Sequence, residues 1–133
     1  MPYLIDSDVV IDHLADVAAA TTLLEQLASE GIAVSIITYM EAYQGVLRSP
    51  HPGSARKHFE AFLATVPVLP FSQACAKRCA QLRETLHKEG KHVKARALDL
   101  MTAAIALEYG LIVVTRNVED YTDIRGLKVY KAN

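Results

Sequence analysis

The sequence predicts an α/β fold with a central, mainly parallel sheet of four to five strands and helices on both faces. Short runs rich in Val and Ile alternate along the chain with longer segments that are typical of helices. The short runs do not alternate polar with apolar residues, so both faces of each strand should be buried, as in a parallel sheet. A length of 133 residues fits one domain, residues 1–133.

Each expected element follows from a local pattern. The strands are apolar runs of three to six residues, and they cover residues 3–5, 32–37, 66–69, 111–115 and 127–130. The helices fill the intervals and cover residues 8–16, 19–31, 39–49, 53–65, 72–90 and 96–110. Three of them should end at a glycine, because glycine readily adopts the left-handed conformation that closes a helix: Gly31, Gly90 and Gly110.

Composition limits the classes of function. Hydrophobic residues make up 51% of the chain, which is enough for a packed core. The formal net charge is -1, so any surface that binds a polyanion must be local. No run approaches the ~18 apolar residues of a membrane span, and the N-terminus lacks a signal-peptide pattern. Cys75 and Cys79 lie four apart with no second pair for zinc, so we expect a reduced, cytoplasmic protein.

Acidic or amide side chains follow several of the expected strands. Asp6 comes directly after the first strand, and Glu41 lies in the first turn after the second. Asp99 lies in the first turn of the helix that begins near residue 96, while Asn117 and Asp120 follow the fourth strand. Because the carboxyl ends of parallel strands share one edge of a sheet, these side chains should lie close together.

Most of these acids also have an ordinary structural explanation. Glu41 with Thr38 forms a T-x-x-E pattern, which is typical of a capping box at a helix N-terminus. Asp99 could favour the positive end of a helix, and Asp120 could belong to a turn. Asp6 is the hardest to explain in this way, because a carboxylate in an apolar strand–helix junction is costly unless it is paired, hydrogen-bonded or bound to a metal.

Taken together, the acids predict a metal centre. Clustered carboxylates repel one another unless a cation is present, and no Lys or Arg adjoins Asp6 or Glu41 in the sequence. Oxygen ligands without paired His or Cys favour Mg²⁺, or Mn²⁺, over zinc. Such an ion activates water and neutralises developing charge, so the predicted chemistry is phosphoryl transfer or phosphodiester hydrolysis.

Four segments of the chain resemble, in order, the acidic motifs of PIN-domain ribonucleases. The segments are LIDSDVVID, TYMEAYQG, ALDLMTAAIALEYG and VVTRNVEDY. The chain is most similar to the VapC-type toxins of prokaryotic toxin–antitoxin pairs, and the resemblance covers essentially its whole length. It implies a PIN-like three-layer α/β/α architecture and a single nuclease domain.

The resemblance also implies roles for individual residues. Asp6, Glu41 and Asp99 match the three central acids of the family, which implies that they are catalytic and bind the metal. The fourth motif offers two candidates for the same roles, since Asn117 can supply a neutral oxygen and Asp120 a charged one. Which of these two completes the site is left open by the sequence.

Further residues should support the site. Ser7 and Asp8 stand where the family commonly has Thr and Asn or Asp, so Asp8 is expected to support the metal's surroundings. Asp8 and Asp12 also fit a solvated first helix, and capping alone is another reading of Asp8. Thr38 and Thr115 end strands beside the acids, where a hydroxyl could bond a carboxylate or cap a helix.

A local basic segment precedes the helix of Asp99. Residues 87–96 include Lys91, Lys94 and Arg96, and they should border the proposed site. These cations would hold substrate phosphates, which makes binding sensitive to salt. A solvated helix end explains them as well, because cations near a helix C-terminus are favoured. Arg116 could contact a phosphate or a neighbouring strand.

The family likeness implies an Mg²⁺-dependent endoribonuclease that acts as a toxin on transfer or ribosomal RNA. Its implied partners are the RNA substrate, a cognate antitoxin protein, and a second copy of the chain or a toxin–antitoxin assembly; no membrane is involved. Three alternatives stay open. They are a housekeeping RNA-processing nuclease, a D-x-D phosphatase or phosphotransferase with Asp6 as nucleophile and Asp8 as acid/base, and a non-catalytic RNA-binding module.

Overall fold

The computed structural model describes residues 2–133 and contains one five-stranded sheet in the order β3-β2-β1-β4-β5. The strands are β1 (Tyr3–Ile5), β2 (Ile32–Ser35), β3 (Val68–Leu69), β4 (Ile112–Thr115) and β5 (Val129–Lys131). Every neighbouring pair runs parallel. The predicted parallel sheet is therefore confirmed, with all five expected strands present.

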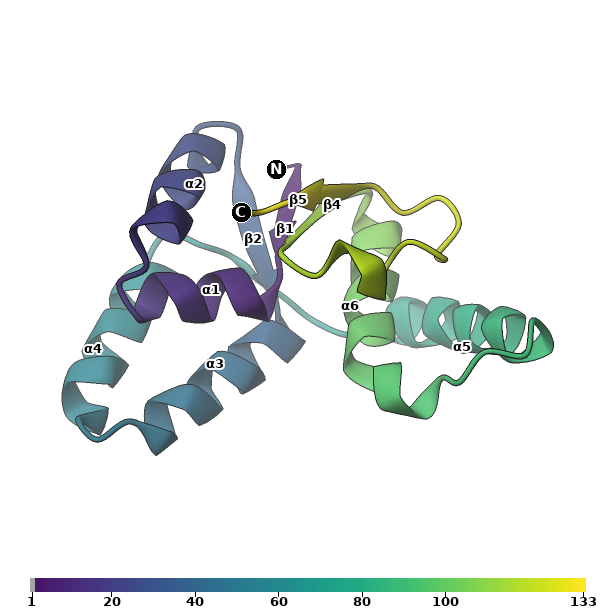
Figure 1. Cartoon of the computed structure of the whole chain (residues 1–133), viewed down its shortest axis with the longest axis horizontal. Helices are drawn as coiled ribbons and strands as arrows, with labels where there is room; N and C mark the ends of the chain where they lie inside the picture. Colours follow the sequence, from purple (N-terminus) through teal and green to yellow (C-terminus); the bar gives the residue numbers. More distant parts are fainter. Residues whose placement is uncertain (1) are drawn as a thin grey trace.

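Helices cover both faces of this sheet. They are α1 (Ser7–Leu14), α2 (Ala18–Ala28), α3 (Ile36–Arg48), α4 (Pro52–Leu63), α5 (Gln73–Lys88) and α6 (Ala97–Tyr109), with two short 3₁₀ helices, η1 (Lys94–Arg96) and η2 (Val118–Asp120). In Figure 1, α1 to α4 gather on one side of the strands, and α5 and α6 lie on the other. The predicted three-layer α/β/α architecture is confirmed.

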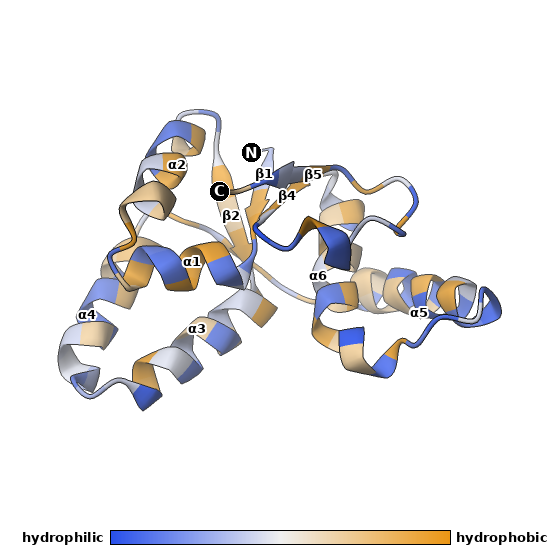
Figure 2. Cartoon of the chain, viewed as in Figure 1, coloured by the Kyte–Doolittle hydropathy of each residue, from blue (hydrophilic) through white to orange (hydrophobic). Residues whose placement is uncertain are grey.

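Successive strand residues supply two separate apolar clusters. Leu4 and Val113 belong to the cluster formed with α5 and α6, whereas Ile5 and Val114 belong to the cluster formed with α1 to α4. All four side chains are fully buried, and Figure 2 shows β2 and β4 in the hydrophobic colours. Both faces of the central strands are thus buried, which explains why their sequences do not alternate polar with apolar residues.

The junction between β2 and α3 differs from the expectation. Ser35, not Thr38, caps the helix, since the Ser35 hydroxyl accepts a hydrogen bond from the Thr38 N–H at 3.1 Å. The strand therefore ends two residues early, and Ile36 begins the helix. The predicted capping box is wrong, and Glu41 lies in the second helical turn. The apolar run concealed this boundary, because continuous apolar residues fit a buried strand and a buried helix equally well.

The order of the strands places a topological switch point between β1 and β4. From β1 the chain passes to β2 and β3 on one side, and it then returns to β4 and β5 on the other side. Connections that diverge in this way leave an opening at the carboxyl ends of the two central strands, where α/β proteins bind their ligands. The Asp6 N–H donates to the Val114 carbonyl at 2.9 Å, which brings Asp6 to this opening. Within residues 2–133, no helix is long and apolar enough to cross a membrane.

Candidate active site

Asp6 is the buried acid at the centre of this edge, with 8% of its surface exposed. It is the N-cap of α1, where one carboxylate oxygen, Oδ1, accepts the Ser7 N–H at 2.9 Å. The other oxygen, Oδ2, accepts the hydroxyl of Tyr121, also at 2.9 Å. Both oxygens are therefore held, one by the helix N-terminus and one by a residue 115 positions away.

The surroundings of Asp6 disfavour its charge. Burial raises the pKa of this carboxyl to about 6, and the neighbouring Asp8 carboxylate adds to the effect. Hydrogen bonds from Tyr121 and Ser7 oppose the rise without cancelling it. The hydrogen bonds do not fully offset the cost of the negative charge, and a carboxylate in this state is suited to receive a cation.

Asp99 is the second acid of the site and lies in the first turn of α6. Burial raises the pKa of Asp99, and the charges of Asp120 and Glu41 raise it further. Arg96 and the Tyr121 hydroxyl act in the opposite direction. Glu41 and Asp120 are thus each close enough to repel Asp99, so α3 and η2 both bring a predicted acid near the start of α6.

A hollow of about 390 Å³ joins two of these acids to a predicted basic residue. Glu41 and Asp99 line it together with Lys94, which lies exposed in η1. Its remaining lining is apolar or small: Ala95, Ala97 and Leu98. A phosphate placed here would meet the Lys94 ammonium beside the two carboxylates.

Asp8 fastens the end of β4 to α1. Its Oδ2 accepts three hydrogen bonds, from the Thr115 hydroxyl at 3.2 Å, the Arg116 N–H at 3.0 Å and the Asn117 side-chain amide at 3.2 Å. Asn117 is accordingly turned toward Asp8, whereas Asp120 lies where its charge acts on the acid of α6. Of the two candidates in the fourth motif, Asp120 is the one placed near Asp99.

Two of the predicted phosphate-binding residues form ion pairs within the protein. The Arg96 guanidinium forms two bonds of 2.7 Å to the Asp123 carboxylate and one of 2.9 Å to the Asp120 carbonyl. Lys91 also reaches Asp123, at 3.1 Å. The bond from Arg96 is the main reason that the pKa of Asp123 falls to about 2. Arg96 therefore ties the segment after β4 to the start of α6.

The other predicted supporting residues are placed as follows. The backbone N–H of Ser7 donates to the Asp6 carboxylate, which caps α1. The Thr38 hydroxyl donates to the Ile5 carbonyl at 3.5 Å, so it bridges β1 and α3. Arg116 pairs with Asp12 at 2.7 Å, and its side chain is 46% exposed. Asp12 is thus an ion-pair partner on α1 rather than an isolated solvated acid.

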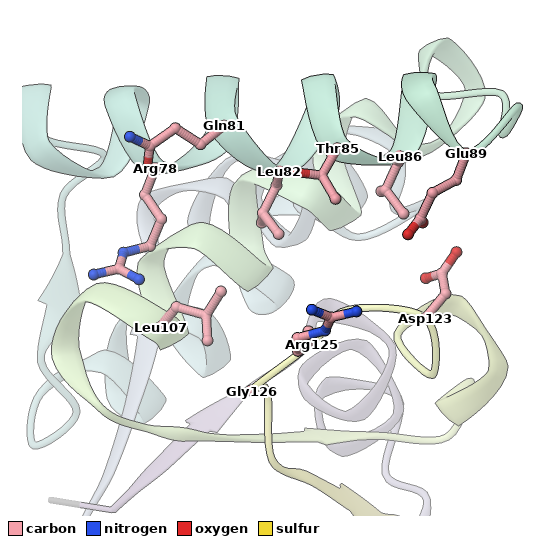
Figure 3. Close-up of a pocket in the computed structure, with 10 residues that line it drawn as sticks. All are labelled: Arg78, Gln81, Leu82, Thr85, Leu86, Glu89, Leu107, Asp123, Arg125 and Gly126. Atoms are coloured by element: carbon pink, nitrogen blue, oxygen red, sulfur yellow. The ribbon is translucent and has the colours of Figure 1, made fainter.

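A second hollow, of about 410 Å³, lies between α5 and the segment 123–126 (Figure 3). It contains Asp123 and Glu89, both of which Lys91 contacts, at 3.1 Å and 4.0 Å. Leu82, Leu86 and Leu107 form its apolar part. None of the predicted catalytic acids lines this hollow, so it is separate from the candidate site.

The chemistry of the site fits a hard divalent cation. In the part of the chain that the structure describes, no three His, Cys, Asp or Glu side chains form a ready group around one point. Mg²⁺ does not require one, because it keeps several waters and takes only one or two carboxylates from the protein. Asp6 and Asp99, with their raised pKa values, meet that need. Asp8 Oδ1 is buried without a hydrogen-bond partner among the described residues, which adds an unsatisfied oxygen.

Tyr121 is the residue of this site that sequence reasoning missed. It is 1% exposed and closes the VVTRNVEDY segment, where a tyrosine reads as an ordinary core residue. One chemical argument could have indicated Tyr121, because a buried tyrosine hydroxyl usually needs a polar partner. Nothing in the sequence indicated that this partner is Asp6.

Comparisons with known proteins agree with this architecture. The family model described as PIN domain matches residues 3–125, and the chain therefore belongs to the PIN domain family. It is 27% identical over 128 residues to the tRNA(fMet)-specific endonuclease VapC of Shigella flexneri, covering 96% of each chain. It is 30% identical over 103 residues to the protein of the same name from Salmonella typhimurium, covering 77% of this chain and 76% of that one.

Solved structures show the same fold. The DNA-bound VapBC structure from Salmonella typhimurium matches with a TM-score of 0.89 and 25% identity, covering 100% of this chain and 99% of that one. VapBC2 from Rickettsia felis, bound to a DNA fragment from its promoter, also gives 0.89, with 24% identity and full coverage of both chains. The expectation of a VapC-type PIN-domain ribonuclease is confirmed at the level of the family.

Proposed function

We propose that this chain is a Mg²⁺-dependent endoribonuclease, with Mn²⁺ as an alternative ion, and that it acts as the toxin of a toxin–antitoxin pair. The single observation that carries the proposal is that Tyr121 lies close to both Asp6 and Asp99, while Glu41 and Asp120 lie close to Asp99. Burial raises the pKa values of Asp6 and Asp99, and neighbouring carboxylates add to the effect: Asp8 acts on Asp6, and Asp120 and Glu41 act on Asp99. A bound cation relieves this electrostatic condition.

Asp6 and Asp99 would hold the ion, directly or through water, with Asp120 beside them. A bound Mg²⁺ supplies a water of lowered pKa and neutralises charge on the phosphate. Glu41, half-buried at the hollow, would ligate the ion or orient the attacking water. Lys94, on the same hollow, would bind a non-bridging phosphate oxygen and so fix the scissile bond in the site.

An RNA substrate follows from the chemistry and from the relatives. The relatives from Shigella flexneri and Salmonella typhimurium are named as tRNA(fMet)-specific endonucleases. We accordingly propose a structured RNA, with transfer RNA tested first and ribosomal RNA second. Arg116 lies half-exposed at the end of β4 and is a second candidate for a phosphate contact, once it leaves Asp12.

The phosphatase alternative has little structural support. It needs Asp8 as a mobile acid or base, whereas Asp8 Oδ2 is held by three donors at the end of β4. It also gives Glu41 no role, although Glu41 faces the same hollow as Asp99. A phosphoenzyme trapped on Asp6 would restore that alternative.

An antitoxin partner is supported by the matched structures, which include DNA-bound VapBC and a toxin–antitoxin complex from Klebsiella pneumoniae. An apolar hollow of about 250 Å³ lies where α1, α3 and α4 meet, and it would accept apolar side chains from such a partner. Its lining comprises Ile11, Leu14, Ala15, Ala42, Gly45, Val46, Ser49 and Ala55. We also propose a homodimer or a larger toxin–antitoxin assembly, to be tested by light scattering with and without the partner.

The site is tested with three nearly isosteric variants, Asp6→Asn, Glu41→Gln and Asp99→Asn. Each should abolish RNA cleavage in Mg²⁺ and Mn²⁺ while the circular dichroism spectrum stays that of the folded protein. Glu25→Ala, which removes an exposed acid on α2, is the matched control and should cleave normally. Full activity in all three site variants would refute the assignment.

The substrate and the biological role are tested by expression. RNA ends mapped after induction should show new cuts in a defined RNA, and Asp6→Asn should produce none. Growth arrest that an adjacent, co-expressed small protein relieves would support the toxin role. Cleavage without arrest would instead indicate a housekeeping nuclease, and RNA binding that never shortens the RNA would indicate the non-catalytic module.

A further inference from the structure

The hydroxyl of Tyr121 is placed at the one buried acid of the site. It donates to Asp6 Oδ2 at 2.9 Å, and this hydrogen bond is buried. The ring belongs to the apolar cluster beneath α5 and α6, and it is 1% exposed. A ring packed in this way has little freedom, so the position of its hydroxyl is fixed by the core.

Asp6 is held from two independent directions. The Ser7 N–H fixes Oδ1, and the Tyr121 hydroxyl fixes Oδ2. One donor on each oxygen defines the plane of the carboxylate, and each oxygen keeps a lone pair for another partner. The two bonds therefore orient Asp6 without consuming its capacity to bind a cation.

The segment that carries Tyr121 is held in place by hydrogen bonds of its own. The Tyr121 N–H donates to the Val118 carbonyl at 3.0 Å, which closes η2. Two residues further on, Asp123 is held by both nitrogens of the Arg96 fork. The tyrosine thus connects the acid at the end of β1 to a segment that is fastened to the start of α6.

We propose that Tyr121 is a positioning residue, whose hydroxyl holds Asp6 in the orientation that receives the divalent ion and thereby sets the affinity of the site for that ion. This inference rests on the proposed metal-dependent function. Outer hydrogen bonds of this kind orient metal ligands, and their removal typically weakens metal binding about 10- to 100-fold. A role in packing alone would instead require only the aromatic ring.

The decisive variant is Tyr121→Phe, which keeps the ring and removes one oxygen. Tyr3→Phe is the matched control, because the Tyr3 hydroxyl donates to the carboxylate of Glu30 at 3.2 Å at an exposed position. Three quantities are measured for each protein. They are Mn²⁺ affinity by isothermal titration without RNA, the melting temperature without metal, and the Mn²⁺ concentration that gives half-maximal RNA cleavage.

Tyr121→Phe should weaken Mn²⁺ binding at least about tenfold and shift the Mn²⁺ midpoint of cleavage by a similar factor. Excess Mn²⁺ should restore most of the rate, and the KM for RNA should not change. Tyr3→Phe should match the wild type in all three measurements. A shift in Mn²⁺ affinity is not expected from a packing role, which would lower the melting temperature and leave the affinity of the folded fraction intact.

Wild-type Mn²⁺ affinity in Tyr121→Phe would overturn the positioning role, while the proposed nuclease function would stand if the wild type still binds Mn²⁺ and cuts RNA. An equal loss of affinity in Tyr3→Phe would also overturn it, because the effect would not be specific to Asp6. A wild type that binds neither Mn²⁺ nor Mg²⁺ would refute the metal-dependent function and this inference with it.

Discussion

The side-chain amide of Asn117 donates a hydrogen bond of 3.2 Å to Asp8, a residue 109 positions earlier in the chain. The same oxygen of Asp8 accepts the Arg116 N–H and the Thr115 hydroxyl. One carboxylate on α1 therefore gathers three successive donors at the end of β4. This arrangement sets the geometry at the end of β4, the strand to which the Asp6 N–H is bonded.

Removing this carboxylate should loosen the end of β4. Asp8→Ala leaves the buried Thr115 hydroxyl and two further donors without their acceptor, and we expect a loss of about 1–3 kcal/mol in the free energy of unfolding. Asp8→Asn keeps one acceptor oxygen and should lose less. Urea unfolding measures both, with the exposed Glu25→Ala as control. Equal stability of Asp8→Ala and the wild type would show that water replaces Asp8 at no cost.

The acidity of Asp6 predicts how the metal-free protein responds to pH. Its pKa is raised to about 6 from an ordinary value of 3.8, so the folded state holds this proton more tightly than the unfolded chain does. The stability contributed by the protonated form is complete below the ordinary pKa and is lost as the pH rises through about 6. A shift of about two units corresponds to roughly 3 kcal/mol at most.

Asp6→Asn removes this titration and isolates it from the other ionisable groups. With chelator present, the variant should be more stable than the wild type near neutral pH, and the two should converge near about pH 4. Mn²⁺ should stabilise the wild type but not the variant, since only a ligand bound to the folded state raises its stability. A constant difference between the two proteins at every pH would contradict the assigned cause.

The sheet, the helices and the proximity of Glu41 to Asp99 could be predicted from the sequence for physical reasons. Apolar runs bounded by Gly indicate buried strands and helix ends, and a parallel order brings the carboxyl ends of the strands together. Glu41 and Asp99 could therefore be expected close together, and the two acids line one hollow. Asp6 stood out because an apolar junction is a costly place for a carboxylate.

The contacts that the sequence did not predict depend on partner residues that a local sequence pattern does not identify. The choice of Ser35 over Thr38 as the cap was hidden in a continuous apolar run. The partners of Tyr121 and Arg96 come from segments far away in the chain, and a local pattern gives no information about them. Arg96 shows this clearly, because a local basic run suggested a phosphate contact, and the fold places Asp123 against its guanidinium.

The ion pair between Arg96 and Asp123 should stabilise the segment that carries Asp120 and Tyr121. Both side chains of the pair are 21% exposed, and the bond from Arg96 lowers the pKa of Asp123 to about 2. Its contribution is therefore present above the ordinary carboxyl pKa and is lost as the pH falls through about 2. Asp123→Asn should cost about 1–3 kcal/mol at neutral pH and should also reduce cleavage.

Arg96→Lys tests the geometry of the same pair. Lysine keeps the charge but cannot form the two parallel bonds to Asp123, so it should not restore wild-type stability. Thermal unfolding of both variants provides the measurement, with Arg56→Lys in the exposed pair with Glu60 as a control that should change little. Wild-type melting in Asp123→Asn would show that the pair is dispensable.

Lys94 is predicted to bind a substrate phosphate and to do nothing else essential. It lies exposed in η1 and lines the hollow that contains Glu41 and Asp99, so Lys94→Ala should raise the KM for RNA several-fold and leave kcat and the melting temperature close to wild type. A lost phosphate contact also reduces the dependence of log affinity on log salt by about 0.7–1. Lys77→Ala on α5 is the matched control, since it removes an equal charge at another exposed position. Equal salt slopes for Lys94→Ala and the wild type would show that this lysine does not contact the RNA.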